Sequence, residues 1–354
     1  MRSFGDPSTA FDGMPARLGV LLGRVDVGRG REELYRDQLP ALLHSLADQT
    51  RIASIRASNA IEGIDIPQDR AERLAAPEPP RSRNRSEAEF AGYRDAIDAL
   101  MQAEQLDPPT PALMLRLHRQ LYAYTKATGG QLKREDNVIG ERGLYGVRRI
   151  AFEPPPWQQT EGLIQGLYAG YLAAVDESAA HPLVLLAAFV LDLLAIHPFE
   201  DGNGRVARLL TTHELLRLGY GVARYISIEQ RIFEQRDGYY DVLEASQRGW
   251  HDGEQLTWPW TEYLVSVLAD CYADFEGRVA AGRGSASMTK AERVLHWVAE
   301  AAPTEFRLAD VRRAVPGASD PTIRLALRSL RDEGKLSSVG SGRGALWRRA
   351  VEPQ

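Results

Sequence analysis

Apolar residues recur with a helical period along most of this chain. The clearest case follows residue 85, where Phe90, Tyr93, Ile97, Leu100 and Met101 fall on one helix face. Similar patterns cover 31–62, 110–123 and most of 157–278. Residues 1–30, rich in glycine and proline, and 64–85 are expected to be irregular. The pattern predicts a mainly α-helical body.

A β-hairpin is predicted inside this helical body. Residues 137–140 and 147–152 read as two short strands, joined by ERGLYG and followed by three prolines at 154–156. The hairpin is therefore expected at about 137–152.

The C-terminal part has the pattern of a separate domain. Residues 280–288 have the composition of a linker, and Thr289 with Glu292 has the spacing of a capping box. Ser319 is the expected N-cap of a later helix, and 336–347 reads as a hairpin. Helix, turn, helix and hairpin is the order of a winged helix. The expected division is an N-terminal helical region 1–105, a helical core 106–279, a linker 280–288 and a winged-helix-like domain 289–354.

Charge distribution and cysteine content limit the kinds of protein that this chain can be. The 354 residues carry a net charge of −5, but 285–354 hold 12 Lys/Arg against 8 Asp/Glu, so a mildly basic module follows an acidic body. Cys271 is the only cysteine, which excludes an intrachain disulfide framework and a multi-cysteine zinc site, and it is expected in the core.

No feature of the sequence predicts contact with a membrane. The first residues, MRSFGDPSTAFDG, lack the apolar stretch of a secretory signal. The longest apolar run, 183–196, is too short to span a bilayer and contains Asp192. We expect a buried helix there, in a cytoplasmic protein.

The segment HPFEDGNGRVAR at 197–208 carries the candidate chemistry. Pro198 disfavours helix at the residue before it, so an irregular turn should follow the apolar helix. Gly202 and Gly204 permit positive φ and leave backbone N–H groups uncovered, and a helix starting there forms an anion site. Arg205 and Arg208, three apart, could then hold more than one phosphate.

Two further side chains of this segment suggest a reaction. Asp201 offers a hard oxygen ligand suited to Mg²⁺ that bridges phosphates. His197 has the side chain whose ordinary pKa, about 6.5, suits a general base. A dinucleotide fingerprint, G-x-G-x-x-A at 202–207, is the competing interpretation, but it requires a preceding strand where a helix is expected. No P-loop sequence occurs.

The segment resembles the Fic motif HPFxDGNGRxxR without a departure. The resemblance implies an α-helical enzyme that transfers AMP from ATP to a Tyr, Ser or Thr hydroxyl of a target protein. His197 would accept the hydroxyl proton and Asp201 would hold Mg²⁺. Gly204 favours AMP transfer, because relatives with lysine there act as kinases. The phosphates would be cradled by Gly202, Asn203, Gly204, Arg205, Val206, Ala207 and Arg208.

Two neighbouring segments resemble the same family. The hairpin at 137–152 is similar to the Fic flap, which would clamp an extended segment of the target by β-augmentation. Gln235 and Tyr240 lie in a segment similar to the one that closes the nucleotide-base pocket. The tyrosine could equally be ordinary packing, and many relatives have asparagine at position 235.

SNAIEG at 58–63 matches the Fic inhibitory motif [S/T]xxxE[G/N]. Ser58 and Glu62 are four apart and should share a helix face, with Gly63 ending the inhibitory helix at about 48–63. In such relatives the glutamate pairs with the second motif arginine, here Arg208, and blocks the γ-phosphate of ATP. Autoinhibition follows as an expectation, as does stronger AMP transfer, including onto the enzyme itself, when Glu62 is removed. A role for Glu62 in removing AMP from a modified target is a second possibility.

The C-terminal module leaves a second class of function open. Arg324, Arg328 and Arg331 are expected on its second helix, with Arg343, Arg348 and Arg349 near the wing. They could contact DNA phosphates, making the chain a DNA-binding regulator whose Fic body senses nucleotide. Binding of the target protein through 289–350, or formation of a homodimer, is the favoured alternative.

Overall fold

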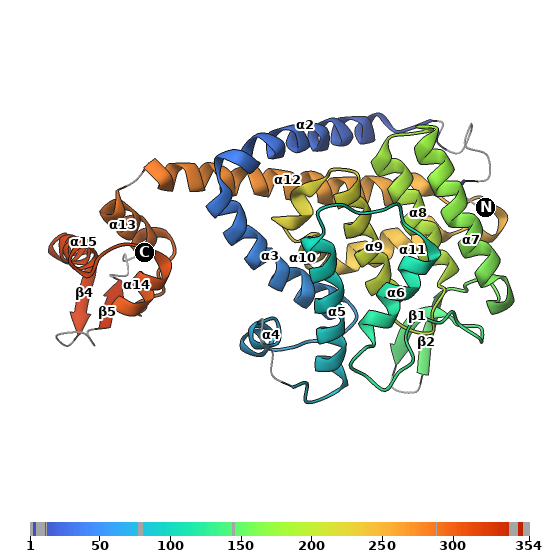
Figure 1. Ribbon diagram of the computed structural model, residues 1–354, viewed down its shortest axis with the longest axis horizontal. Helices are drawn as coiled ribbons and strands as arrows, with labels where there is room; N and C mark the ends of the chain where they lie inside the picture. The colour runs from blue at the N-terminus through green and yellow to red at the C-terminus, as the bar shows by residue number, and fades with distance from the viewer. Residues whose placement is uncertain are drawn as a thin grey trace. The chain divides into compact units, whose positions relative to one another are not determined.

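The computed structural model describes residues 3–4, 11, 13–76, 81–143, 146–287, 289–339 and 346–349. It divides into two compact units, Met1–Glu276 and Gly277–Gln354 (Figure 1). Each unit has its own core, so each is described by itself.

The first unit is helical apart from one hairpin. Its helices, the last of which extends beyond Glu276, are α2 (Ala16–Gln38), α3 (Pro40–Ile61), α4 (Gln68–Leu74), α5 (Arg85–Gln102), α6 (Pro111–Leu121), α7 (Trp157–Asp176), α8 (Pro182–Ile196), α9 (Asn203–Arg217), α10 (Ile228–Glu234), α11 (Arg236–Gln247) and α12 (Thr257–Ser287). Short 3-10 turns are η1 (Gly221–Arg224) and η2 (Trp250–Asp252). Strands β1 (Ile139–Gly143) and β2 (Gly146–Phe152) pair antiparallel, which confirms the predicted hairpin; residues 144 and 145 lie outside the described part.

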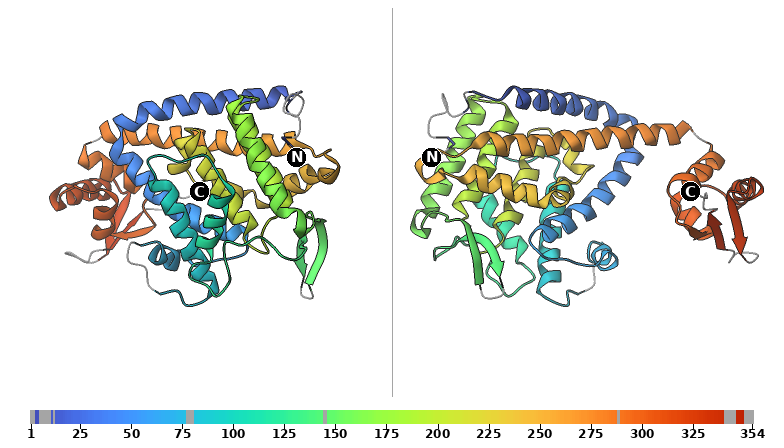
Figure 2. Two further views of the ribbon diagram at one scale, coloured as in Figure 1. Left: turned by 45° about the vertical axis from the view of Figure 1, so that its right-hand side comes forward. Right: turned by 180° about the vertical axis from the view of Figure 1, so that it is seen from behind.

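Helix α8 forms the centre of this unit. Every residue of 183–196 is buried, as expected for a helix that is apolar on all sides. Its one charge, Asp192, accepts hydrogen bonds from the backbone N–H of Ser3 at 3.0 Å and from Trp250 Nε1 at 2.8 Å. Helices α7 and α9 pack against α8, and α3 and α5 pack against α9. The end of α8 at His197 therefore lies among helices that are far apart in the sequence. In Figure 2 the hairpin lies at an edge of the unit.

Three expectations about local structure are wrong. Residues 16–30 belong to α2, and one of its glycines, Gly28, packs closely on α12: a Cβ on Gly28 would lie 2.6 Å from Cγ of Tyr272. Residues 68–74 form α4, whose Arg70 is held by Glu87 at 2.6 Å. Residues 280–287, whose composition predicts a flexible chain, are helical and continue α12.

The second unit is small and mixed. Its elements beyond α12 are α13 (Lys290–Glu300), β3 (Glu305–Arg307), α14 (Leu308–Ala314), α15 (Asp320–Asp332), β4 (Leu336–Val339) and β5 (Leu346–Arg349). The strands form an antiparallel sheet in the order β3-β5-β4. The predicted capping box of Thr289 and Glu292 and the N-cap at Ser319 are both present. Its core includes Val294, Phe306, Val311, Ile323 and Leu327.

Among the described residues no helix is both long and apolar enough to cross a bilayer. Cys271 is fully buried, as its sequence context predicts.

Candidate active site

His197 stands at the C-terminal end of α8 in a left-handed conformation, with φ 50° and ψ 62°. Its Nδ1 lies 3.2 Å from the carbonyl oxygen of Leu194. A carbonyl can only accept, so Nδ1 carries the hydrogen and Nε2 keeps the lone pair. Burial, with a smaller contribution from the charge of Lys133, lowers the pKa of His197 to about 4. The imidazole is therefore a neutral base at pH 7.

Lys133 binds the C-terminal end of α8. Its side chain is 3% exposed, and Nζ donates to the carbonyl of Ile196 at 3.3 Å, to that of Pro155 at 3.1 Å and to Oδ1 of Asn137 at 2.8 Å. A cation at a helix C-terminus is favoured by the helix dipole. The cost of burying this ammonium lowers its pKa to about 8, and the three acceptors hold it in place.

Asn137 extends the same support to the motif itself. Its Nδ2 donates to the carbonyl of Phe199 at 2.9 Å and to that of His197 at 3.3 Å. The backbone N–H of Lys133 donates to the carbonyl of Pro198 at 2.8 Å. The segment before β1 therefore fixes the backbone that positions the candidate base.

The turn between α8 and α9 is packed around Phe199. This side chain is fully buried and stacks on the ring of His118 with centroids 3.7 Å apart. Nδ1 of His118 accepts from the backbone N–H of Gly130 at 2.8 Å, so its Nε2–H donates to the carbonyl of Asp201 at 3.1 Å. Asn203 closes the turn by bonding both the N–H and the carbonyl of Phe199, at 2.9 and 2.8 Å.

The N-terminus of α9 is open to an anion. Its N-cap, Gly202, has φ 84° and no side chain to cap the first N–H groups. Such uncapped groups bind phosphate readily. Gly204 lies in the first turn, where a Cβ would come within 2.2 Å of Oε1 of Glu62. Any larger residue at 204 would therefore have to displace Glu62.

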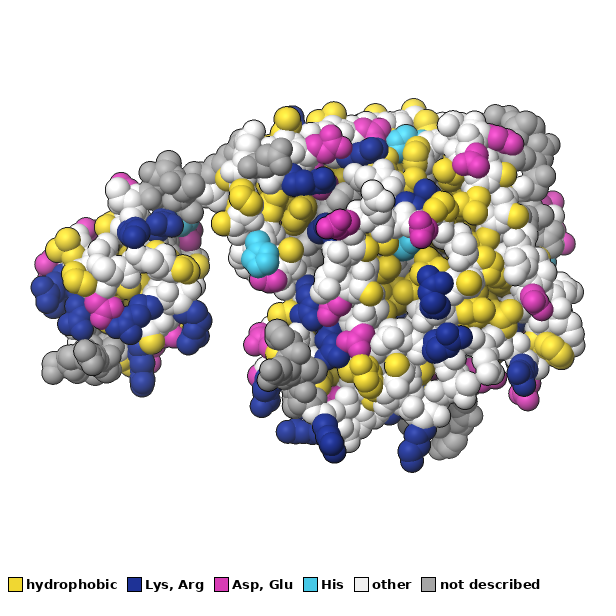
Figure 3. Space-filling model, in the orientation of Figure 1, with side chains coloured by type: hydrophobic (Ala, Val, Ile, Leu, Met, Phe, Trp, Pro, Cys, Tyr) yellow, Lys and Arg dark blue, Asp and Glu magenta, His cyan; other side chains and the backbone are white. Residues whose placement is uncertain are grey.

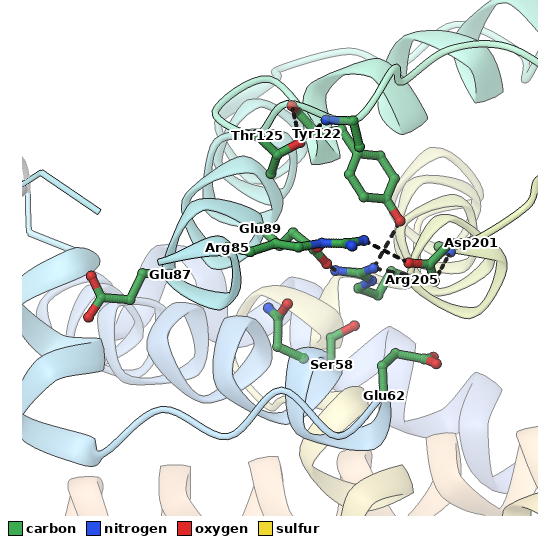
Figure 4. Close-up of polar contacts among 12 residues, drawn as sticks. Ser58, Glu62, Arg85, Glu87, Glu89, Tyr122, Thr125, Asp201 and Arg205 are labelled. Carbon is green, nitrogen blue, oxygen red and sulfur yellow. Dashed lines mark hydrogen bonds and ion pairs between the residues drawn. The ribbon is translucent and has the colours of Figure 1, made fainter. Parts of the chain in front are cut away.

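The two motif arginines have different surroundings. Arg205 is 1% exposed; its Nη1 donates to Oε2 of Glu89 at 2.6 Å and its Nη2 to the hydroxyl of Tyr122 at 3.1 Å (Figure 4). Arg208 donates from Nη2 to Oε1 of Glu62 at 2.8 Å. Among the described residues, Nη1 of Arg208 is buried without a partner. Arg208 therefore retains a donor for a ligand.

Ser58 and Glu62 both contact Arg208. Ser58 Oγ accepts from Nε of Arg208 at 2.8 Å, and the Ser58 carbonyl accepts from Nη2 at 2.9 Å. Helix α3 ends at Ile61, so Glu62 is the cap residue rather than part of the helix, and Gly63 follows with φ 79°. Figure 4 shows both side chains at this end of α3.

Asp201 is the exposed acid of the site. Its side chain is 61% exposed, with Oδ1 accepting from the N–H of Gly202 at 2.7 Å and Oδ2 lying 3.3 Å from Nη2 of Arg85. No cluster of three or more metal-binding side chains occurs among the described residues. Mg²⁺ commonly binds one or two carboxylates together with substrate phosphates, so a single exposed carboxylate beside the uncapped N-terminus of α9 fits it.

Comparison with known proteins agrees with this arrangement. The sequence profile of the Fic/DOC family matches residues 108–215. This chain carries a Fic/DOC domain. It is 29% identical over 137 residues to the protein adenylyltransferase Fic of Culex quinquefasciatus, and equally identical to that of Drosophila melanogaster. Each match covers 38% of this chain and about a quarter of the relative, 24%.

Solved structures share the fold of the Fic domain and its surroundings. A Fic family protein from Desulfovibrio desulfuricans G20 superposes with a TM-score of 0.61 at 20% identity, covering 96% of this chain and 98% of that one. A Fic domain containing signaling protein from Bacteroides thetaiotaomicron VPI-5482 gives 0.57 at 21% identity over 73% and 95% of the two chains.

The two residues expected near the nucleotide base have different surroundings. Gln235 is exposed between α10 and α11. Tyr240 is 39% exposed and its hydroxyl donates to the carbonyl of Ile61 at 3.3 Å, next to Glu62. The structure thus brings Tyr240 to the end of α3.

Sequence reasoning missed the residues that support the Fic motif. Glu89 had a signal: it lies four before Tyr93 on the apolar face of α5, where a lone carboxylate needs a buried partner. His118 similarly lies on the buried face of α6. Lys133 and Asn137 lie in a polar segment with no periodicity, so no local pattern marks them.

The arginines of the second unit are largely engaged within it. Arg331 pairs with Asp332 at 3.1 Å, and Arg348 pairs with Glu305 at 2.6 Å. Arg349 donates to carbonyls at the end of α13, at 2.8 and 3.0 Å. Arg328 is exposed and Arg324 half-buried on α15, and Arg343 lies outside the described residues.

Proposed function

We propose that this chain is a protein adenylyltransferase that transfers AMP from ATP to a hydroxyl of a target protein, and that Glu62 holds it inactive. The observation that carries the proposal is the free lone pair of His197 Nε2 beside the turn that begins α9. The uncapped N–H groups of this turn, together with Asp201 and Nη1 of Arg208, can receive a nucleoside triphosphate. The names of the Culex and Drosophila relatives support the same chemistry.

In this proposal each group has one task. His197 Nε2 accepts the proton of the attacking hydroxyl as its oxygen bonds to the α-phosphorus and pyrophosphate leaves. The N-terminus of α9 and Arg208 hold the phosphates by charge-assisted hydrogen bonds. Asp201 would hold Mg²⁺, which neutralises phosphate charge when bound. Arg205 positions the turn through Glu89 and Tyr122.

The hairpin is the proposed docking site for the target. It is two-stranded, and its strands pair only with each other among the described residues. Each strand therefore has an outer edge that can pair with an extended segment. Val138 and Ile150 are 44% and 50% exposed and could pack against its side chains.

The inhibitory role of Glu62 follows from competition for one guanidinium. Its carboxylate occupies Nη2 of Arg208, and Ser58 occupies Nε, so a γ-phosphate meets only Nη1. A hydrogen bond between charged groups contributes about 1.5–3 kcal/mol. Removing Glu62 should therefore favour productive ATP binding by about 10- to 150-fold.

The test uses wild type, Glu62→Gly and His197→Ala with α-labelled ATP and a cell lysate. Glu62→Gly should label itself and other proteins more strongly than wild type does. The labelled peptides should be heavier by the mass of AMP less water. His197→Ala should label nothing. Equal labelling by all three proteins would refute the proposal. Incubating pre-modified target with wild type and Glu62→Gly shows whether Glu62 also supports AMP removal.

The second unit does not favour a DNA-binding regulator. Of the arginines considered for DNA, Arg331 and Arg348 are paired with carboxylates, which weakens the phosphate contacts that DNA affinity requires. We propose instead that a winged-helix-like unit at 289–350 contacts protein.

A further inference from the structure

Arg85 is an exposed arginine at the candidate active site. Its side chain is 65% exposed, whereas the side chains of Arg205 and Arg208 are 2% and 5% exposed. Nη2 of Arg85 lies 3.3 Å from Oδ2 of Asp201, and Oδ1 of Asp201 accepts from the N–H of Gly202 at 2.7 Å. One carboxylate group therefore separates the Arg85 guanidinium from the N–H groups that begin α9.

The place of Arg85 in its own helix does not explain this residue. It is the first residue of α5, where the helix dipole disfavours a positive charge. Its pairing with Glu89, four residues later, runs in the less favourable order, basic before acidic. The N-cap of α5 is provided by Asn84 instead, whose side chain accepts from the N–H of Glu87 at 2.9 Å. What lies opposite the start of α5 therefore explains Arg85 better than the stability of the helix does.

Arg85 is tethered to a buried acid. Its Nε donates to Oε1 of Glu89, and the other oxygen of Glu89 accepts from Arg205 at 2.6 Å. Glu89 is only 3% exposed, so the tether is fixed to the buried side of the site. Nη1 of Arg85 has no hydrogen-bond partner among the described residues. Figure 4 shows the side chain reaching from α5 to Asp201, so its guanidinium is held at the turn with donors to spare.

The pair of Arg85 and Asp201 resembles the pair of Arg208 and Glu62. In both pairs the carboxylate is partly exposed, 61% for Asp201 and 31% for Glu62, so water can solvate it when another ligand takes the arginine. An exposed ion pair contributes little stability, so its exchange costs little. Asp201 also keeps a second cation nearby, because Nη2 of Arg205 lies 3.8 Å from its Oδ1. Arg85 can therefore leave Asp201 for an anionic ligand.

We propose that Arg85 binds a phosphate group of the nucleotide directly, as a second phosphate-binding arginine besides Arg208. The inference rests on the proposed nucleotide site at the N-terminus of α9. When Asp201 holds Mg²⁺, its charge no longer requires Arg85, and the Nη groups can donate to a phosphate oxygen in charge-assisted hydrogen bonds. The tether to Glu89 keeps the guanidinium in place, so little side-chain freedom is lost when phosphate binds.

Calorimetric titration with ATP and Mg²⁺ tests the proposal. The parent protein is Glu62→Gly/His197→Ala, in which Glu62 does not compete and ATP is not consumed. Arg85→Ala is added to it, with Arg73→Ala as the matched control, since Arg73 is 58% exposed and also pairs with a carboxylate, that of Asp69 at 2.6 Å. Figure 3 shows several Lys and Arg side chains on the surface around α4 and the start of α5, so the control separates a specific contact from the general positive charge there.

Arg85→Ala should weaken ATP binding by about 10-fold, the contribution of one charged hydrogen bond, and Arg73→Ala by less than about twofold. The loss should persist in an Asp201→Asn background, because a direct contact with phosphate does not need the carboxylate. Two results would overturn the proposal and leave the nucleotide site standing: equal affinities of the Arg85→Ala and Arg73→Ala proteins, or disappearance of the Arg85→Ala effect in the Asp201→Asn background. Absence of ATP binding by the parent protein would overturn the nucleotide site and the role of Arg85 together.

Discussion

The turn between α8 and α9 has two sides that differ in how fully their polar groups are bonded. The supporting side is largely buried and most of its polar groups bond other parts of the protein, although Nε of Arg205 has no partner among the described residues; this side comprises Glu89, His118, Tyr122, Lys133, Asn137 and Arg205. The open side keeps unpaired or exposed groups; it comprises Glu62, His197, Asp201 and Arg208.

The two arginine–carboxylate pairs show what this difference means. Arg205 and Glu89 are 2% and 3% exposed at their side chains, so neither charge can leave without being stranded away from water. In the pair of Arg208 and Glu62 the carboxylate is 31% exposed, so water can solvate it when a ligand takes its place. One pair holds the turn, and the other can exchange its partner.

The largest expected effect comes from breaking the buried pair. Glu89→Ala leaves Arg205 without its carboxylate and should lower the free energy of unfolding by about 3–5 kcal/mol. Glu62→Ala, the matched change on the open side, removes one charged hydrogen bond but leaves Arg208 bonded to Ser58, so it should lower the free energy of unfolding by less, about 1.5–3 kcal/mol. Urea unfolding measures both, and equal losses would contradict the division into two sides.

A smaller effect is expected from Asn137→Ala, which leaves the carbonyls of His197 and Phe199 without their side-chain donor. Loss of one buried hydrogen bond costs about 1–3 kcal/mol. In a Glu62→Gly background we expect kcat for AMP transfer to fall by about 10-fold while KM for ATP stays within about twofold. A change in KM alone would place Asn137 on the nucleotide rather than behind His197.

Ser58→Ala should weaken the hold on Arg208 while leaving Glu62 in place. The lost bond from Nε contributes about 1 kcal/mol, so ATP should bind about fivefold more tightly. Ser54→Ala is the control, because Ser54 is equally buried one turn earlier and bonds Ser227 instead. Calorimetric titration with ATP should show tighter binding for Ser58→Ala and unchanged binding for Ser54→Ala. Equal affinities of the two variants would mean that Ser58 does not restrain Arg208.

The smallest expected change is with pH. Because the pKa of His197 is lowered to about 4, its imidazole should stay neutral from pH 7.5 down to about 5.5. A histidine with the ordinary pKa of about 6.5 would be about 90% protonated at pH 5.5. NMR titration of the Nε2 and Nδ1 signals, with His197→Ala to assign them, should show no midpoint near 6.5; such a midpoint would mean that the base is solvated.

Local sequence was sufficient for most elements and for the centre of the candidate site. Helices α5, α6 and α8, the hairpin and the capping box at Thr289 follow from periodicity and side-chain chemistry. Helix α2 did not, because its glycines favour an irregular chain locally, and Gly28 is explained only by its contact with Tyr272 from a helix more than 200 residues later.

The sequence by itself determined the string at 197–208, the serine and glutamate at 58 and 62, and hence the chemistry they can supply. Only the tertiary structure decided that Glu62 lies on Arg208, that Arg205 is committed to Glu89, and that Lys133 and Asn137 hold the end of α8. The physical reason is that a local pattern encodes backbone preference and the burial of a face. Which buried charge meets which partner depends on elements far apart in the chain, and a cation or an amide is stable there only once all its acceptors have been assembled.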